Sequence, residues 1–127
     1  MTGYISVTRT NSFHVKNADL FKKIVSQISE PMATFKEKAE DGSTVYGFCG
    51  NGQIAGFKGD EYNERRVYNV FKDHVIVPGE AIVIEAVGAE GLSYLSAYAV
   101  IITAEKIESI DLNEEIEKRL SIANAVV

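Results

Sequence analysis

Short turn signals between runs of β-forming residues constrain the fold of this chain more than any other feature. Asp41-Gly42 separates two alternating runs, Gly50-Asn51-Gly52 follows the second run, and residues 88–91 separate two longer ones. Asp-Gly between alternating runs is a strong hairpin signal, because glycine adopts the positive φ angles that tight turns need. Strands joined by such turns pair with their chain neighbours, so we expect a largely antiparallel sheet.

Alternation and helical periodicity predict nine elements in the order β-α-β-β-β-α-β-β-α. The predicted strands cover residues 4–15, as one or two segments, and then 32–38, 44–49, 53–57, 81–87 and 92–102. The first predicted helix follows Asn17, the second covers 62–75, and the third begins within 109–113. The sequence therefore predicts a single α+β domain over residues 1–127, with one largely antiparallel sheet and helices packed on one face.

The helix after Asn17 has the clearest pattern in the chain. Asn17 is a suitable N-cap, and Pro31 follows the end of the helix, where proline is tolerated. Its apolar residues recur at helical spacing and are Leu20, Phe21, Ile24, Val25 and Ile28. For the last helix, Asp111 with Glu114 three positions later is a variant of the capping box, and Asn113 is the rival cap.

The predicted strand over 92–102 is apolar on both faces near residues 99–102, which indicates a central place in the sheet. Tyr94 and Tyr98 share one of its faces. Tyrosines anchor interfaces well, and they also cover half-buried sheets. The strand and its tyrosines thus leave open both a homodimer interface and an ordinary core.

Charge and composition limit the classes of partner. The chain has 127 residues and a net charge of −5, and residues 80–127 hold nine acidic and three basic groups. A chain that binds nucleic acid normally carries a basic patch, which this sequence lacks. The longest apolar run, 97–103, is far shorter than a membrane span, and a single cysteine fits a reducing compartment. We expect a cytoplasmic protein that contacts neither nucleic acid nor membrane directly.

The acidic residues of the C-terminal third are the most distinctive chemical feature. A face rich in carboxylates favours fast association with a basic partner, although carboxylates at a helix start also serve simply to solvate it. As candidate protein-binding residues the sequence offers Glu105, Glu108, Asp111, Glu114, Glu115 and Glu117.

The glycine turn near Cys49 is a second, disfavoured candidate for ligand binding, through Cys49, Gly50 and Gly52. A phosphate-binding loop leads into a helix N-terminus, whereas the residues after Gly52 have a strand-like pattern. Cys49 with His14 or His74 does not match a known nucleophile signature or a closed zinc ligand set. The sequence thus predicts no catalytic residue, no metal and no cofactor.

Three segments of the chain carry a resemblance to a known group. They are residues 9–15 (RTNSFHV), 47–54 (GFCGNGQI) and 85–103 (EAVGAEGLSYLSAYAVIIT). In this order they resemble small uncharacterised proteins of bacterial conjugative transposons and phages, which commonly contain R-T-N-x-F-x-V, G-F-G-x-x-G-x-I and E-V-G-x-E-K-L-R-Y motifs. The resemblance implies an accessory protein of a mobile element that acts on host defence, replication or transfer by binding. It supplies no catalytic residues.

These observations favour a non-enzymatic accessory protein that binds a host or element protein, for example to inhibit a defence or nucleic-acid-processing complex. One alternative is a small-ligand or nucleotide-binding enzyme that uses the glycine turn near Cys49. Another is an immunity-type or structural interaction protein.

Overall fold

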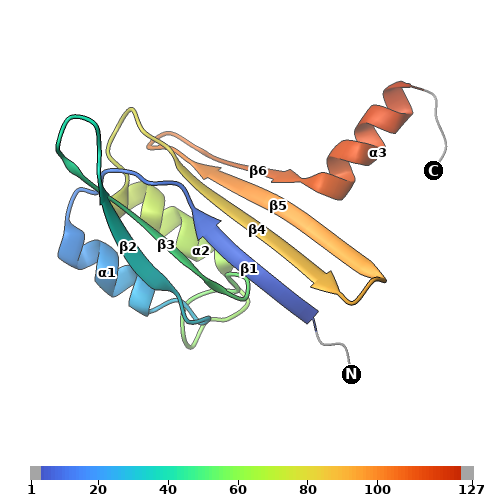
Figure 1. Ribbon diagram of the computed structural model, residues 1–127, viewed down its shortest axis with the longest axis horizontal. Coiled ribbons are helices and arrows are strands. Elements are labelled where there is room, and N and C mark those ends of the chain that lie inside the picture. The colour runs from blue at the N-terminus through green and yellow to red at the C-terminus, as the bar shows by residue number, and fades with distance from the viewer. Residues whose placement is uncertain (1–3, 124–127) are drawn as a thin grey trace.

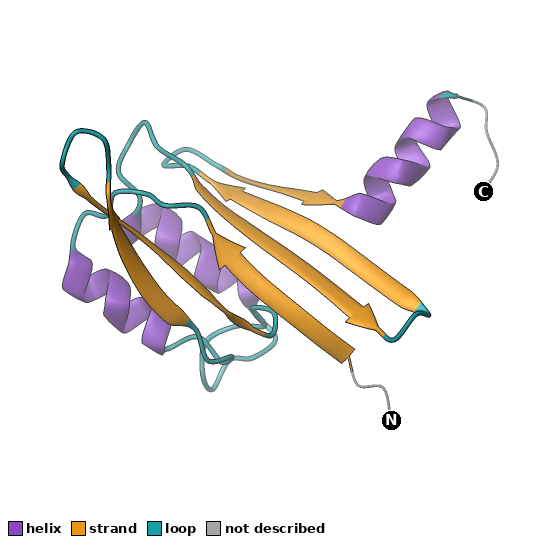
Figure 2. Cartoon of the chain, in the orientation of Figure 1, coloured by secondary structure: helices purple, strands orange, loops and turns teal. Residues whose placement is uncertain are grey.

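The computed structural model describes residues 4–123, which form a six-stranded antiparallel sheet and three helices (Figure 2). The strands are β1 (Tyr4–Thr10), β2 (Ala33–Lys38), β3 (Thr44–Asn51), β4 (Ile82–Glu90), β5 (Tyr94–Ile102) and β6 (Ile107–Asp111). The helices are α1 (Ala18–Ser26), α2 (Glu64–Val70), which continues as the π-helical turn η1 (Phe71–Val75), and α3 (Leu112–Ile122). The predicted α+β class and antiparallel sheet are confirmed.

The sheet has the strand order β2-β3-β1-β4-β5-β6 (Figure 1). β1 pairs with β3 on one side and with β4 on the other, so the two middle strands are β1 and β4. The long strand β5 lies between β4 and β6, one strand from the edge. Its interior position explains its apolar character, but the sequence places it too centrally.

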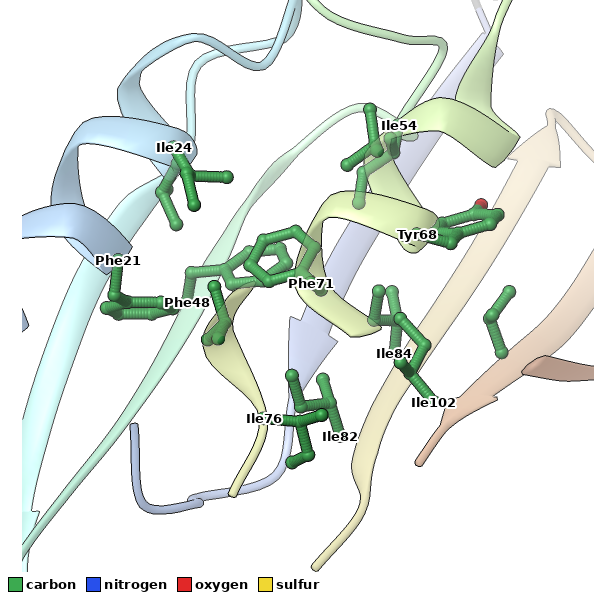
Figure 3. Close-up of a cluster of buried hydrophobic side chains, with 14 of the residues drawn as sticks. Phe21, Ile24, Phe48, Ile54, Tyr68, Phe71, Ile76, Ile82, Ile84 and Ile102 are labelled. Carbon is green, nitrogen blue, oxygen red and sulfur yellow. The ribbon is translucent and has the colours of Figure 1, made fainter. Parts of the chain in front are cut away.

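The helices α1 and α2 pack on one face of the sheet and enclose the core (Figures 1 and 3). Asn17 caps α1 as predicted, since its side chain accepts a hydrogen bond from the Leu20 N–H at 3.0 Å. The helix then buries Phe21, Ile24 and Val25 against the sheet. Fully buried aromatic rings from three segments meet there, with the Phe48 and Phe71 ring centroids 5.5 Å apart. This aromatic cluster fixes α1, β3 and η1 to one another.

The observed element order is β-α-β-β-α-β-β-β-α, which differs from the predicted order in two places. Residues 53–57 form no strand of the sheet, because β3 is already paired with β2 on one side and β1 on the other. Gly56 there has a φ of 148°, and Phe57 makes only isolated bridges to Ile28 and Asp60. The additional strand is β6, whose five residues pair with β5 although their pattern lacks a strand signal.

The last helix, α3, follows β6 without a loop and projects away from the sheet (Figure 1). Asp111 is its N-cap, and its side chain accepts from the Glu114 N–H at 3.1 Å, so Asp111 rather than Asn113 fills this role. None of its described side chains is buried, although Ile116 and Leu120 have the spacing of a core-facing stripe. Within the described residues, Ile116 thus stays exposed and Leu120 is only half-buried.

The face opposite α1 and α2 is called the open face here, because no helix covers it in residues 4–123 (Figure 1). Alternate residues of four neighbouring strands point to it, and its main apolar members are Ile5, Val7, Val87, Leu95, Ala97 and Ile110. Within the same described residues, no helix has the length and apolar character that crossing a membrane requires.

Candidate functional site

The acidic residues proposed from the sequence do not form one patch. Asp111 and Glu114 line a cavity on the helix-covered face, whereas Glu115 lines a hollow on the open face. Glu117 is exposed on α3. The sheet and the first turn of α3 therefore separate these carboxylates into two environments.

The remaining two acidic candidates lie at the β5–β6 hairpin. Glu105 is exposed in the turn, and the Glu108 carboxylate pairs with the Lys106 ammonium at 2.9 Å. This ion pair raises the pKa of the exposed Lys106, mainly through the hydrogen bond to Glu108. Glu108 is thus paired within its own hairpin, whereas Glu105 is exposed at the tip of this hairpin.

The cavity that contains Asp111 and Glu114 is the most distinctive polar feature of the helix-covered face. It has a volume of about 510 Å³ and lies beside α2, over β5 and β6. In Figure 1, α1 and α2 lie behind the part of the sheet formed by β2, β3 and β1, which leaves β5 and β6 uncovered by these helices on this face. The charged and aromatic side chains that line the cavity are Glu64, Arg65, Tyr68, Tyr98, Asp111 and Glu114.

Two tyrosines form the boundary between the cavity and the core. Tyr68 on α2 is nearly buried and packs at the end of the core opposite Phe21 (Figure 3). Burial raises the pKa of the Tyr68 phenol, and the neighbouring Tyr98 phenol and Glu64 carboxylate raise it further. The phenol therefore stays neutral throughout the physiological range and offers a hydrogen-bonding group and an aromatic ring.

The chemistry of this wall favours a cation. Three carboxylates face the cavity against one guanidinium, that of Arg65. Carboxylates bind ammonium and guanidinium groups through charge-assisted hydrogen bonds, and tyrosine rings attract the same groups through their π-faces. Among residues 4–123, no three His, Cys, Asp or Glu side chains are arranged to hold a metal ion. The carboxylates and tyrosine rings of this wall are groups that contact organic cations such as lysine and arginine side chains.

The glycine turn has a packing role at each of its candidate positions. A Cβ on Gly50 would lie 2.8 Å from the Met32 sulfur and still closer to the Pro31 carbonyl oxygen. The residues that precede β2 therefore cover the backbone of Gly50. Gly52, with a φ of 99°, donates its N–H to the Ser6 carbonyl at 2.8 Å. The turn leads into a loop and not into a helix N-terminus. Cys49 is half-buried on β3, opposite Arg9 of β1.

His74 lies in η1, on the helix-covered side of the sheet, whereas Cys49 pairs with Arg9, whose side chain lies on the open face. His14 instead joins a polar network that sequence analysis missed. Its Nδ1 lies 2.9 Å from the Glu80 carboxylate and its Nε2 lies 2.6 Å from the Ser43 hydroxyl. The Ser43 hydroxyl also bonds Asp41. Three connections, before α1, between β2 and β3, and before β4, meet in this network, so the primary sequence contains no local signal for it.

The order Ser43–His14–Glu80 is that of a serine hydrolase triad, but its surroundings are structural. The Gly42 N–H donates to the Ala39 carbonyl and the Ser43 N–H donates to Asp41, so these two donors are occupied within the hairpin. An acyl-transfer site needs such donors for its oxyanion. We interpret the network as structural, because its hydrogen bonds join the three connections to one another.

No protein-family model, curated protein or solved structure matches this chain.

Proposed function

We propose that this protein is a non-enzymatic accessory protein of a mobile element that binds a basic segment of a host or element protein. The observation that carries the proposal is the cavity of about 510 Å³ beside α2, with Glu64, Asp111 and Glu114 in its wall. A lysine or arginine side chain of the partner enters this cavity and pairs with the carboxylates. The partner is then a defence or nucleic-acid-processing protein whose function depends on that basic segment.

Three features of the molecule support this assignment. The cavity unites two of the acidic residues that the sequence singles out, Asp111 and Glu114, with Glu64 from a distant helix. Its volume lies within the range of roughly 300–1,000 Å³ of pockets that hold small groups specifically. The two tyrosines add aromatic faces beside the carboxylates, and such faces attract cations.

The wider setting agrees with a binding role. The resemblance to proteins of conjugative transposons and phages implies action by binding, and carboxylates carry the same sign of charge as a phosphate backbone. The net charge of −5 also favours association with a basic surface, at a rate that falls as salt is raised.

The test is a direct binding measurement with a defined probe. A fluorescent peptide of about ten arginines is titrated with the protein, and anisotropy reports the dissociation constant. We expect Glu64→Lys combined with Glu114→Lys to raise that constant at least tenfold, which corresponds to about 1.4 kcal/mol. A pull-down from bacterial lysate with the same variant then recovers the natural partner only with the wild-type protein.

The matched control changes the same amount of charge elsewhere. Glu105→Lys combined with Glu117→Lys alters two exposed carboxylates outside the cavity and is expected to retain the partner and most of the peptide affinity. Equal losses in both double variants would show that only net charge matters. Failure of the wild-type protein to retain any stoichiometric partner would contradict the proposal.

A further inference from the structure

The open face of the sheet is apolar and hollow in its middle. Cross-strand pairing sets its side chains in rows, such as Ile5–Ala89–Leu95 and Val7–Val87–Ala97. The outer members are strongly exposed, with Ile5 at 70% and Leu95 at 72%. An exposed apolar surface of this kind marks an interaction site.

The hollow is an apolar trough formed by two adjoining cavities of about 460 and 420 Å³. The two share Val87, Ala97 and Leu112, so the trough is continuous from β1 across β4 and β5 to the start of α3. Its floor is low because Ala89, Ala97 and Ala99 stand where the rows at its rim have larger residues. Small residues in the centre of a sheet face leave room for the ridge of a helix.

The helix α3 carries an apolar stripe that the described residues of its own chain leave unburied. Leu112, Ile116 and Leu120 form a stripe at i, i+4 and i+8, and none of them is buried. α3 begins at the residue after β6 ends, so no loop allows it to turn back onto its own sheet (Figure 1). Leu112 and Glu115, in the first turn of α3, line the trough, and beyond this turn the helix points away from the sheet (Figure 1).

We propose that two copies of this chain pair through their open faces, with α3 of each copy lying in the apolar trough of the other. Each copy thus supplies an unburied apolar helix and an open apolar trough. A two-fold axis places the helix of each copy in the trough of the other, because an isologous interface uses the same surface on each subunit. Four strands at about 4.8 Å spacing and seven residues at about 3.4 Å per residue span roughly 19 by 24 Å. Together with α3, this approaches the roughly 800 Å² per subunit that stable interfaces bury.

The charges beside the two surfaces are complementary. Arg9 and Glu85 are direct partners across β1 and β4 on the open face. On α3, Glu115 and Arg119 flank the apolar stripe one turn apart. A helical turn of about 5.4 Å matches the distance of about 4.5–5.5 Å between such cross-strand partners. In the dimer, Glu115 of one copy meets Arg9 of the other, and Arg119 meets Glu85.

This dimer leaves the cavity beside α2 accessible, because that cavity lies on the helix-covered face. The inference is therefore independent of the proposed function. If both hold, each dimer presents two cation-binding cavities and gains in avidity for a partner with repeated basic segments.

The first experiment measures self-association by sedimentation velocity from about 1 to about 300 µM. We expect a concentration-dependent dimer for the wild-type protein and at least a tenfold rise in its dissociation constant for Ile116→Lys and for Ala97→Lys. Tyr62→Lys, which changes a fully exposed side chain in the loop before α2, is the matched control and is expected to dimerise normally. Circular dichroism confirms that each variant is folded.

A charge exchange identifies the occupant of the trough. Arg9→Glu and Glu115→Arg are each expected to weaken the dimer, because like charges then meet at both copies of the contact. Mixed in equal amounts, the two variants regain the dimer, because both contacts in the mixed pair then join opposite charges. Recovery on mixing requires that residue 9 of one copy lies near residue 115 of the other.

Three results would overturn the inference. The wild-type protein would remain a monomer at all concentrations, or the dimer would be insensitive to Ile116→Lys and Ala97→Lys, or the mixture would fail to regain the dimer. If the protein is a monomer that binds a different protein, and Ala97→Lys abolishes that binding, the trough would instead be assigned to a heterologous partner. The peptide titration with the cavity variants is unaffected by all of these outcomes, so the two proposals fail separately.

Discussion

The two faces of the sheet are both apolar, and they differ in what covers them. On one face, α1, α2 and η1 bury a continuous cluster in which Phe21, Phe48 and Phe71 are each fully inaccessible. On the other face, Val87 and Leu95 remain exposed, and the nearest helix, α3, leaves the sheet. The same alternation of apolar residues thus produces a buried core on one side and an exposed apolar surface on the other.

Within residues 4–123, the sheet has more apolar surface than α1, α2 and η1 cover. The half of the open face nearest β2 is covered by side chains of the sheet itself. The Phe35 ring lies over Gly47, and the Arg9 guanidinium stacks on that ring at 4.8 Å. The half formed by β4 and β5 has no such cover among the described residues. That half is therefore the apolar surface on which the proposed dimer depends.

The largest expected loss of stability comes from a substitution on the covered face. Phe48→Ala removes a ring that packs between Phe21 and Phe71, and we expect it to lower the free energy of unfolding by about 3–5 kcal/mol. Leu95→Ala on the open face is the counterpart and is expected to change stability by less than about 0.5 kcal/mol in dilute solution. Urea denaturation measures both. Comparable losses would mean that the open face is also a core within one chain.

A smaller effect separates the two halves of the open face. Gly47→Ala places a Cβ against the Phe35 ring and 2.8 Å from the Asn11 carbonyl oxygen, and we expect a loss of about 1–3 kcal/mol from overpacking. Ala97→Val adds volume in the trough, where the dilute monomer has room for it, and is expected to be nearly neutral. Thermal melts of both variants test this difference. A neutral Gly47→Ala would show that Phe35 does not hold its place over the sheet.

The helix caps sharpen the comparison further. Asn17→Ala removes the cap of a helix that buries three side chains, so we expect global stability to fall by about 1 kcal/mol. Asp111→Ala removes the cap of α3, which buries none, so we expect less helical signal at 222 nm without a shift in the main unfolding transition. A shift as large as that of Asn17→Ala would show that α3 contributes to the core.

The smallest effect concerns pH at the β2–β3 hairpin. The Ser43 hydroxyl, followed by the Ser43 backbone N–H, lowers the pKa of the exposed Asp41 carboxyl below its ordinary value of 3.8. A lowered pKa in the folded state stabilises the fold fully above that ordinary value, and the contribution is lost as the pH falls through the folded-state pKa. We expect wild type to exceed Asp41→Asn slightly in stability at pH 6, and the two to converge once the pH has fallen below the folded-state pKa of Asp41. A constant difference across this range would argue against ionised Asp41 as the cause.

Much of the local structure was predictable from the sequence. The helix after Asn17, its cap, the Asp41-Gly42 hairpin and the antiparallel class are as predicted. The predicted helix over 62–75 is found as α2 and η1. Of the six acidic candidates, Asp111 and Glu114 share one cavity, and neither its third carboxylate, Glu64, nor its tyrosines was linked to them by spacing.

The type of most elements follows from local sequence, because caps, turns and periodicity act between residues a few positions apart. Which strands became neighbours depends on long-range packing. It inserted β1 beside β3, so residues 53–57 found no edge to pair with and remained a loop. It also gave β6 its strand conformation through the free edge of β5. Which apolar face is covered depends on where the few helices pack, and no local pattern contains that information.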